Sequence, residues 1–512
     1  MNRKLNWPVS VTTLYVLLIL AIHPIIFQNH YFNILNVKYY FYCVCSIALF
    51  VLLGGYYLFS ALSKKSERKY SIQALLKTLS PTDYAFLAFL LIAFISTMLS
   101  DFKYEAFWGN EGRFSGAFLL LLYTLSYFCV SRLLHFKSWF LDIALLSGMA
   151  VCLFGITDFF KMDLLHFKEG VKNPDMYTSF IGNINMYTGL LSIYMGTAAF
   201  LWVSCPNKLR SFWYYIHVWI IFVALITGQS DNAYLALAAA FVFIPFYAFR
   251  SRRGIRRYLI LLATFLTSLK LVEWISTVYS DRVIHIYSIY NTLVGFSKLV
   301  PLLTSLWVLA AVLLLIDLIT KKTDAKVTPW LSRIWGVLTA LAFVSFIYVL
   351  YDVNIAGNVE KYGAAQKFLL FNDAWGTHRG AIWRIAITDY KGLSTIHKLF
   401  GHGPDTFGLM TYYRNHEEMS NVFHMIFENA HNEYLQYLIT IGPLGLISYL
   451  AIFATAFVRI IRKGSSNPYI LAPMFGVICY GVQAFVNIAT PITVPILLLF
   501  LSMSLAGCRE TL

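Results

Sequence analysis

Charged side chains are scarce in this chain of 512 residues, where Asp, Glu, Lys and Arg together make up 13%. In soluble proteins such residues make up about a quarter, so an array of soluble domains is excluded. Hydrophobic residues make up 59% of the chain and aromatic residues 17%. Apolar runs of about 20 residues, each long enough to cross a bilayer, recur along nearly the whole length. We therefore expect an all-α integral membrane protein, a polytopic bundle of about 12–14 transmembrane helices with the lipid bilayer as partner.

The expected spans follow one another with short connections for most of the chain. The first lacks a small-residue cleavage site and is expected to remain as an anchor. The spans are predicted at 11–27, 40–62, 83–100, 115–134, 140–160, 183–204, 211–227, 232–249, 256–274, 301–319, 330–351, 431–460, 468–487 and 490–507.

Cysteine and metal motifs are also missing. The 7 cysteines all fall within or at the ends of predicted spans, so no disulfide framework is expected. Neither a DxD nor an HExxH motif occurs, which argues against a glycosyltransferase with a carboxylate-held metal. The remaining metal hypothesis has a spacing that matches no standard zinc site, so we expect no metal and no cofactor. Its ligands would come from His416, Glu417, Glu418, His424 and Glu428.

The net charge of +15 raises the question of nucleic-acid binding. Lys and Arg, however, come in short clusters between spans, and no basic helix interleaved with aromatic residues occurs, so no nucleic-acid partner is expected. If the N-terminus is cytoplasmic, every connection on the inside is basic, as the positive-inside rule requires. These connections are 64–77, 132–137, 208–210, 250–257, 321–326 and 459–463.

This topology divides the chain into three parts. Residues 1–351 hold the earlier spans with short loops, 352–430 form one long extracytoplasmic loop, and 431–512 hold the last spans. The long loop is mixed in polarity and rich in Gly, His and aromatic residues, unlike a disordered linker. We expect function on this side of the membrane.

A first short helix is predicted within the long loop at 378–391. Apolar residues recur there at helical spacing, and Thr377 is available as a cap. Arg379 and Trp383 share one face of this helix, while Arg384 points elsewhere.

A second short helix is predicted to begin within the sequence LFGHGPDTFGL, residues 399–409. Its Gly-His-Gly-Pro forces a turn, after which Asp405 is expected to cap a helix that ends near Arg414. Two short helices placed over the mouth of the bundle would form a lid.

The stretch 429–445, NAHNEYLQYLITIGPLG, joins the longest polar segment to a very apolar one and contains a Gly-Pro break. Polar groups at a membrane boundary are costly unless they have a task. A neutral imidazole at His431 could take a proton from an acceptor hydroxyl. The alternative is structural: a helix N-terminus with Asn429 or Asn432 near the capping position.

The external side also carries arginines, which suggests an anionic, lipid-borne substrate. A polyprenyl diphosphate glycan fits, because guanidinium groups hold phosphate oxygens by paired hydrogen bonds. Arg113 and Arg379 stand out because each lies beside Gly in a polar turn that feeds a helix. For any single arginine, a salt bridge or a lipid-headgroup contact is the alternative. The external arginines are Arg113, Arg282, Arg379, Arg384 and Arg414.

Several of these segments resemble, in the same order, pieces of the O-antigen ligase and polysaccharide polymerase superfamily. They are GNEGRFSG, FIGNINMYTGLLSIY, HRGAIWRIA, LFGHGPDTF, HNEYLQYLITIG and VNIATPITVPILLLF, and the resemblance covers roughly residues 100–507.

The resemblance implies a protein of the bacterial cytoplasmic membrane with its active site on the extracytoplasmic side. It implies transfer of a glycan from undecaprenyl diphosphate to a glycan, lipid or protein acceptor, without metal and with inversion. By this resemblance His431 is the catalytic histidine and Arg379 matches the diphosphate-binding arginine of the long loop. The substrate-binding residues expected around them are Arg384, Asn432, Trp383, Asp405 and Arg414.

One position departs from the resemblance. Many members carry an arginine at the head of the helix that matches 232–249, as a second diphosphate ligand, whereas this chain has Asp231 and Asn232 there. We expect Arg113 to replace the missing arginine as a catalytic residue; the alternative is a site that handles its leaving group differently. The alternatives for the protein as a whole are a repeat-unit polymerase and, in a different class, a lipid-glycan flippase.

Overall fold

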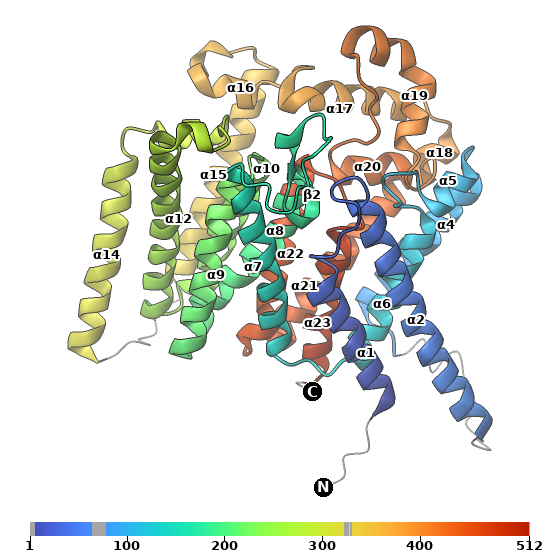
Figure 1. Cartoon of the computed structure of the whole chain (residues 1–512), viewed down its shortest axis with the longest axis horizontal. Helices are drawn as coiled ribbons and strands as arrows, with labels where there is room; N and C mark the ends of the chain where they lie inside the picture. Colours follow the sequence, from blue (N-terminus) through green and yellow to red (C-terminus); the bar gives the residue numbers. More distant parts are fainter. Residues whose placement is uncertain (1–5, 64–77, 322–326, 328–329, 511–512) are drawn as a thin grey trace.

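The computed structural model describes residues 6–63, 78–321, 327 and 330–510, and these are helical almost throughout. Ten of the described helices are long and apolar enough to cross a membrane, and three apolar helices are shorter. Every predicted span contains a helix, and the all-α polytopic fold is confirmed (Figure 1). The long helices are α2 (Ile34–Ser63), α4 (Pro81–Leu99), α7 (Trp139–Phe159), α8 (Ile184–Ser204), α9 (Lys208–Thr227), α12 (Arg252–Val278), α14 (Leu299–Thr320), α15 (Trp330–Asn354), α21 (Gly442–Gly464) and α22 (Pro468–Gln483), the last continued by η7 (Ala484–Val486).

The remaining elements complete the bundle and its connections. The shorter apolar helices are α1 (Trp7–Leu17) with η1 (Leu18–Ile22), α6 (Ala117–Leu133), and α10 (Asn232–Phe243) with α11 (Pro245–Ala248), and the last helix of the chain is α23 (Val494–Glu510). The connections hold α5 (Lys103–Trp108), η2 (Pro174–Met176), β1 (Tyr177–Thr178), η3 (Ser179–Ile181), β2 (Gly182–Asn183), η4 (Ser280–Arg282) and α13 (Ile289–Val294). The two strands pair in antiparallel register, Tyr177 with Asn183 and Thr178 with Gly182.

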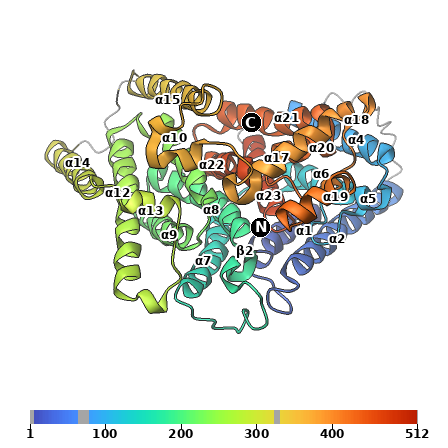
Figure 2. The ribbon, with the colours of Figure 1, turned by 90° about the horizontal axis from the view of Figure 1, so that it is seen from above.

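Helix α8 is the centre of the bundle, with 94% of its most apolar stretch buried. It packs against α22 through glycines, since Gly196 faces the carbonyl of Phe475 and Gly476 faces the carbonyl of Ile193. Small residues let two membrane helices approach this closely. At the other extreme, α14 and α15 lie at the edge of the bundle with 11% and 0% of the corresponding stretch buried (Figures 1 and 2).

Both termini lie at one end of the bundle and the long segment 352–430 lies at the other (Figure 1). The basic connections 132–137, 208–210, 250–257 and 459–463 are at the end that carries the termini. The predicted basic connection 64–77 and residues 322–326 lie outside the described residues. The alternation of helix direction therefore agrees with the predicted topology wherever the chain is described.

The long segment forms a folded cover over its end of the bundle (Figure 2). It has a small apolar core of its own, built largely from Ile382, Ile385, Phe407, Met410 and Phe427. It contains more helices than the two predicted. They are η5 (Glu360–Ala365), α16 (Gln366–Leu369), α17 (Trp375–Lys391), α18 (Thr395–Phe400), α19 (Phe407–Glu418) and η6 (Met419–Phe423).

The prediction of one continuous span at 431–460 is wrong. The chain forms α20 (Glu433–Thr440), breaks at Ile441, and starts α21 at Gly442, whose φ is +76°. Segment 399–403 fills the break: the amides of His402 and Gly403 donate to the carbonyls of Ile439 and Thr440, at 3.2 and 2.9 Å. The carbonyls at the end of α20 are thus satisfied by the cover, which fixes its position on the bundle.

Candidate active site

His431 lies immediately before α20, and two asparagines shape the backbone around it. The Asn432 side chain caps the helix by accepting from the amides of Tyr434 and Leu435, at 3.1 and 3.0 Å. The Asn429 side chain accepts from the amide of His431 at 2.9 Å. His431 itself has φ +45°, in the left-handed region that non-glycine residues seldom occupy and that recurs at functional sites.

Helix α17 places Arg379 beside this turn. Gly376, Thr377 and His378 all have positive φ, so regular helix begins only at Arg379 and the prediction that Thr377 caps it is wrong. One turn later, Trp383 donates from Nε1 to the carbonyl of Ala430 at 2.9 Å, next to His431. Arg379 donates from Nη1 to the Gly376 carbonyl at 2.6 Å, while its Nε is buried without a partner.

Arg113 reaches the same site from the loop between α5 and α6. Its Nη2 lies 3.1 Å from Oε2 of Glu428, and its Nε is buried without a partner. Burial, the charge of Arg379 and the charge of Arg113, in that order, lower the pKa of His431 to about 3. The imidazole is therefore neutral in the free protein at physiological pH, and its buried Nδ1 has no partner either.

Asp405 fastens the cover to the loop that carries Arg113. One oxygen of the buried carboxyl accepts from the amides of Asn110 and Ser115, at 2.8 and 2.9 Å. Burial raises the pKa of Asp405 to about 7, against the lowering effect of these two bonds and of Arg113. The prediction that Asp405 caps the second short helix is wrong, because α19 begins after Thr406 and has no side-chain cap.

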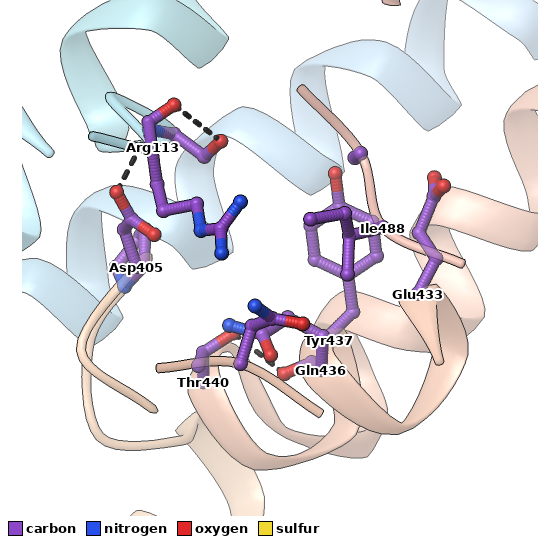
Figure 3. A pocket seen from close by; sticks show the side chains of 11 residues that line it. Arg113, Asp405, Glu433, Gln436, Tyr437, Thr440 and Ile488 are labelled. Carbon is purple, nitrogen blue, oxygen red and sulfur yellow. Dashed lines mark hydrogen bonds between the residues drawn. The ribbon is translucent and has the colours of Figure 1, made fainter. Parts of the chain in front are cut away.

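A pocket lies between the Arg113 loop, the cover and α20. Figure 3 shows the Arg113 guanidinium pointing into it with Asp405 beside it, and Gln436, Tyr437 and Thr440 across from it. Its lining is Arg113, Ser115, Pro404, Asp405, Asn429, Glu433, Gln436, Tyr437, Thr440, Ile488 and Ala489.

Only Arg113 and Asp405 of these lining residues were among the predicted site residues, and Glu433 and Gln436 are two polar residues that the prediction missed. Glu433 is 1% exposed and accepts from the hydroxyls of Tyr449 and Tyr480, the latter at 2.9 Å. Gln436 accepts from the amide of Ala430 at 2.9 Å. The signal for both was available, because Glu433, Gln436 and Thr440 recur at helical spacing in an apolar stretch.

Residues 286–450 match the family model described as O-antigen ligase. This part of the chain is therefore similar to the O-antigen ligase family. A comparison with curated proteins finds no match. The matched range contains Arg379, Asp405 and His431, whereas Arg113 lies before it. The family implies a glycan-transfer enzyme of the ligase or polymerase type in a membrane.

Two arginines that were predicted from the sequence to bind substrate have other partners. Arg384 pairs with Asp373 through two bonds of 3.0 Å and with Glu418 through one of 2.6 Å, so it braces the cover. Arg414 is exposed on α19 and donates to the carbonyl of Asp389 at 3.4 Å. Neither lines the pocket beside Arg113.

The predicted alternative metal set also has other roles. Glu418 pairs with Arg384 and Glu428 with Arg113. Over residues 6–63, 78–321, 327 and 330–510, no three side chains of His, Cys, Asp or Glu converge as a metal site would need.

Asp231 lies at the position where the resemblance described in the sequence analysis implies a second arginine. It is held by the Ser288 hydroxyl at 2.5 Å and the Ile289 amide at 3.3 Å. Burial lowers the pKa of Arg379, and the negative charge of Asp231 opposes that shift. The departure from the family pattern therefore puts a carboxylate within electrostatic reach of Arg379.

Next to Asp231, a polar cluster joins the start of α10 to two segments whose sequences resemble the superfamily. The side-chain oxygen of Asn185 accepts from Ser230 and Asn232, at 2.8 and 3.2 Å, and its carbonyl accepts from Asn487 at 2.8 Å. Ile488, the residue after Asn487, lines the pocket beside Arg113. The resembling segments, distant in sequence, thus meet at one end of the bundle.

Proposed function

We propose that this protein transfers an oligo- or polysaccharide from undecaprenyl diphosphate to an acceptor on the extracytoplasmic side of a bacterial cytoplasmic membrane, without metal and with inversion. The observation that carries the proposal is a neutral, half-buried His431 whose pKa is lowered in part by two arginines, each with an unpartnered buried Nε. An imidazole base beside two guanidinium groups suits a reaction in which a hydroxyl loses a proton while a diphosphate leaves.

In the proposed reaction the acceptor hydroxyl oxygen attacks the anomeric carbon from the face opposite the diphosphate, and the glycosidic carbon–oxygen bond to the diphosphate breaks. The electron pair leaves with the diphosphate, whose negative charge Arg379 and Arg113 stabilise. The hydroxyl proton passes to the imidazole of His431. Stabilisation of the developing charge on the leaving group contributes more to the rate than the base does.

The charges of the two arginines also make the basicity of His431 depend on whether the donor is bound. In the free protein burial, followed by the charges of Arg379 and Arg113, lowers the pKa of His431 to about 3, where it accepts a proton poorly. A bound diphosphate opposes the charge of both arginines and so raises this pKa. His431 is therefore a better base with the donor in place than without it.

A repeat-unit polymerase, whose acceptor is a second lipid-linked glycan, uses the same groups. The test is a strain lacking the protein, complemented with the wild type or with His431→Gln. We expect the deletion and the variant to accumulate lipid-linked glycan and to lose one surface polymer. Accumulation of full-length polymer on the lipid identifies a ligase, and accumulation of single repeat units a polymerase. Normal lipid-linked glycan levels in the deletion would contradict glycan transfer altogether.

A further inference from the structure

A groove lies between α12 and α14. Its basic residues belong to the starts of α9 and α12, at the end of the bundle opposite the cover (Figure 1). Its mouth is lined by four cations, Lys208, Arg253, Arg256 and Arg257, and among the residues described no carboxylate lines it. The Arg257 guanidinium lies over the ring of Trp202, 5.0 Å from its centroid. The mouth therefore combines concentrated positive charge with an aromatic wall.

Side-chain bonds hold α14 against α12 on either side of the groove. Asp317 on α14, 1% exposed, pairs with Arg252 and Arg256 on α12, the Arg252 contact at 3.4 Å. Trp307, nearer the other end of α14, donates from Nε1 to the Thr267 hydroxyl at 3.2 Å. Asp317 balances one of the positive charges here, so the region stays strongly cationic.

The groove becomes apolar a short way from the cations. Ile260 lies one helical turn beyond Arg256, about 6 Å along α12. Trp307, Ala311 and Leu314 line the groove on the α14 side, and Trp307 and Leu314 are 38% and 46% exposed. Because the rest of α14 is little buried, this wall opens sideways toward the bilayer. A ligand that fits both parts must have an anionic head and an apolar tail.

We propose that this groove binds an anionic phospholipid. Its phosphate lies against Lys208, Arg253 and Arg256, and one acyl chain lies along Ile260, Trp307 and Leu314. Basic pockets between membrane helices bind anionic headgroups in this way. A zwitterionic lipid has no net negative charge to match the four lining cations, and a free phosphate would leave the apolar wall uncovered. The site is independent of the proposed glycan transfer, since it lies at the other end of the molecule.

The test titrates the purified full-length protein in detergent with palmitoyl-oleoyl phosphatidylglycerol or phosphatidylcholine and counts bound lipid by native mass spectrometry. The wild type is expected to prefer phosphatidylglycerol. Each cation near an anionic lipid contributes roughly fivefold in affinity, so Lys208→Gln/Arg253→Gln should bind phosphatidylglycerol about 30-fold more weakly. The matched control Lys137→Gln/Arg462→Gln removes the same charge at the same end of the bundle outside this groove, and should keep the preference.

A second variant tests the apolar half. Ala311→Trp fills the groove at an exposed position without changing charge, and should also lower phosphatidylglycerol binding. The proposal is overturned if the two double variants lose phosphatidylglycerol equally, if Ala311→Trp binds as the wild type does, or if added inorganic phosphate displaces the lipid. A wild type without preference between the two lipids overturns it as well.

Discussion

The carbonyl oxygen of Leu399 lies 2.1 Å from the position that a Cβ on Gly442 would occupy. Gly442 starts α21, and Leu399 belongs to the cover, so the missing side chain is what allows the cover to sit in the break between α20 and α21. Segments 399–403 and 431–442 both resemble the superfamily, and this contact joins them.

Replacing Gly442 with Ala should therefore lower the thermal stability of the purified protein sharply. The positive φ alone costs about 1–2 kcal/mol in the free energy of unfolding, and the clash adds about 1–3 kcal/mol. Gly357→Ala is a matched control, since Gly357 has φ +77° but no atom within 4 Å of the added Cβ. Equal melting temperatures for the two variants would mean that the cover can move away from the added Cβ without loss of stability, which would contradict this prediction.

His431→Gln tests the base. Loss of a general base costs about 10²–10⁴-fold in turnover, so we expect at least a hundredfold slower transfer by folded protein that still binds the donor. In the wild type, kcat should fall as pH falls through the pKa of His431 with the donor bound. This fall in kcat should occur well above pH 3. The pH profile of kcat/KM for the donor, which reports the free protein, should not show a fall in that range. A variant that keeps more than about a tenth of turnover would leave the arginines as the main catalytic groups.

Arg379→Lys should weaken donor binding and slow transfer together, because the charge stays while the paired geometry of the guanidinium is lost. We expect kcat/KM for the lipid-linked donor to fall about 10- to 100-fold. Arg282→Lys is the control, an exposed arginine at the same end of the bundle outside the site. Steady-state kinetics at varied donor concentration measures kcat and kcat/KM for each variant. An equal effect of the two substitutions would contradict a role of Arg379 in the mechanism.

Asp405 should make stability depend on pH. Its pKa is about 7 in the folded protein and 3.8 ordinarily, so between those values the folded state keeps a proton that the unfolded state has lost. The free energy of unfolding then falls with rising pH, by at most about 1.4 kcal/mol per pH unit, and levels off above pH 7. Asp405→Asn keeps an oxygen for Asn110 and Ser115 but cannot ionise. Its melting temperature minus that of the wild type should therefore rise from pH 5 to pH 8, and a constant difference would contradict the assignment.

The topology can be tested with cysteines at two similarly exposed positions. Tyr413 in the cover is 73% exposed and Leu209 at the opposite end is 79% exposed. In intact cells Tyr413→Cys should react with an impermeant thiol reagent and Leu209→Cys should not. The unsubstituted protein gives the background from its own free cysteines. Labelling of Leu209→Cys alone would place the candidate active site in the cytoplasm.

The sequence predicted the spans well because apolar length and basic connections are properties of single segments. It also predicted Arg379 and Trp383 on one helix face. The break at Ile441 was lost within an apolar run, although the Gly-Pro pair that follows it was a signal. A Gly-Pro pair can either bend a helix or divide it into two helices. The outcome depends on which segment packs into the break, and in this protein that segment belongs to the cover.

The prediction that Asp405 caps a helix was wrong for a related reason. An Asp after a Gly-Pro turn usually caps the next helix, and local sequence offers no sign of two backbone amides from a distant loop. The polar residues of α20 could have been found from their spacing. The effect of Asp231 on Arg379 could not have been predicted from the sequence, because only the folded structure brings Asp231 close to α17.

The bond between Asn110 and Asp405 joins residues 295 positions apart in the chain. A ribosome adds about 5–20 residues per second, so Asp405 follows Asn110 by about 15–60 s of synthesis. For that interval the loop that carries Arg113 has neither Asp405 nor Glu428 as a partner, and the cover has not yet been made. The active site is thus assembled late in synthesis, because its parts come from both halves of the chain.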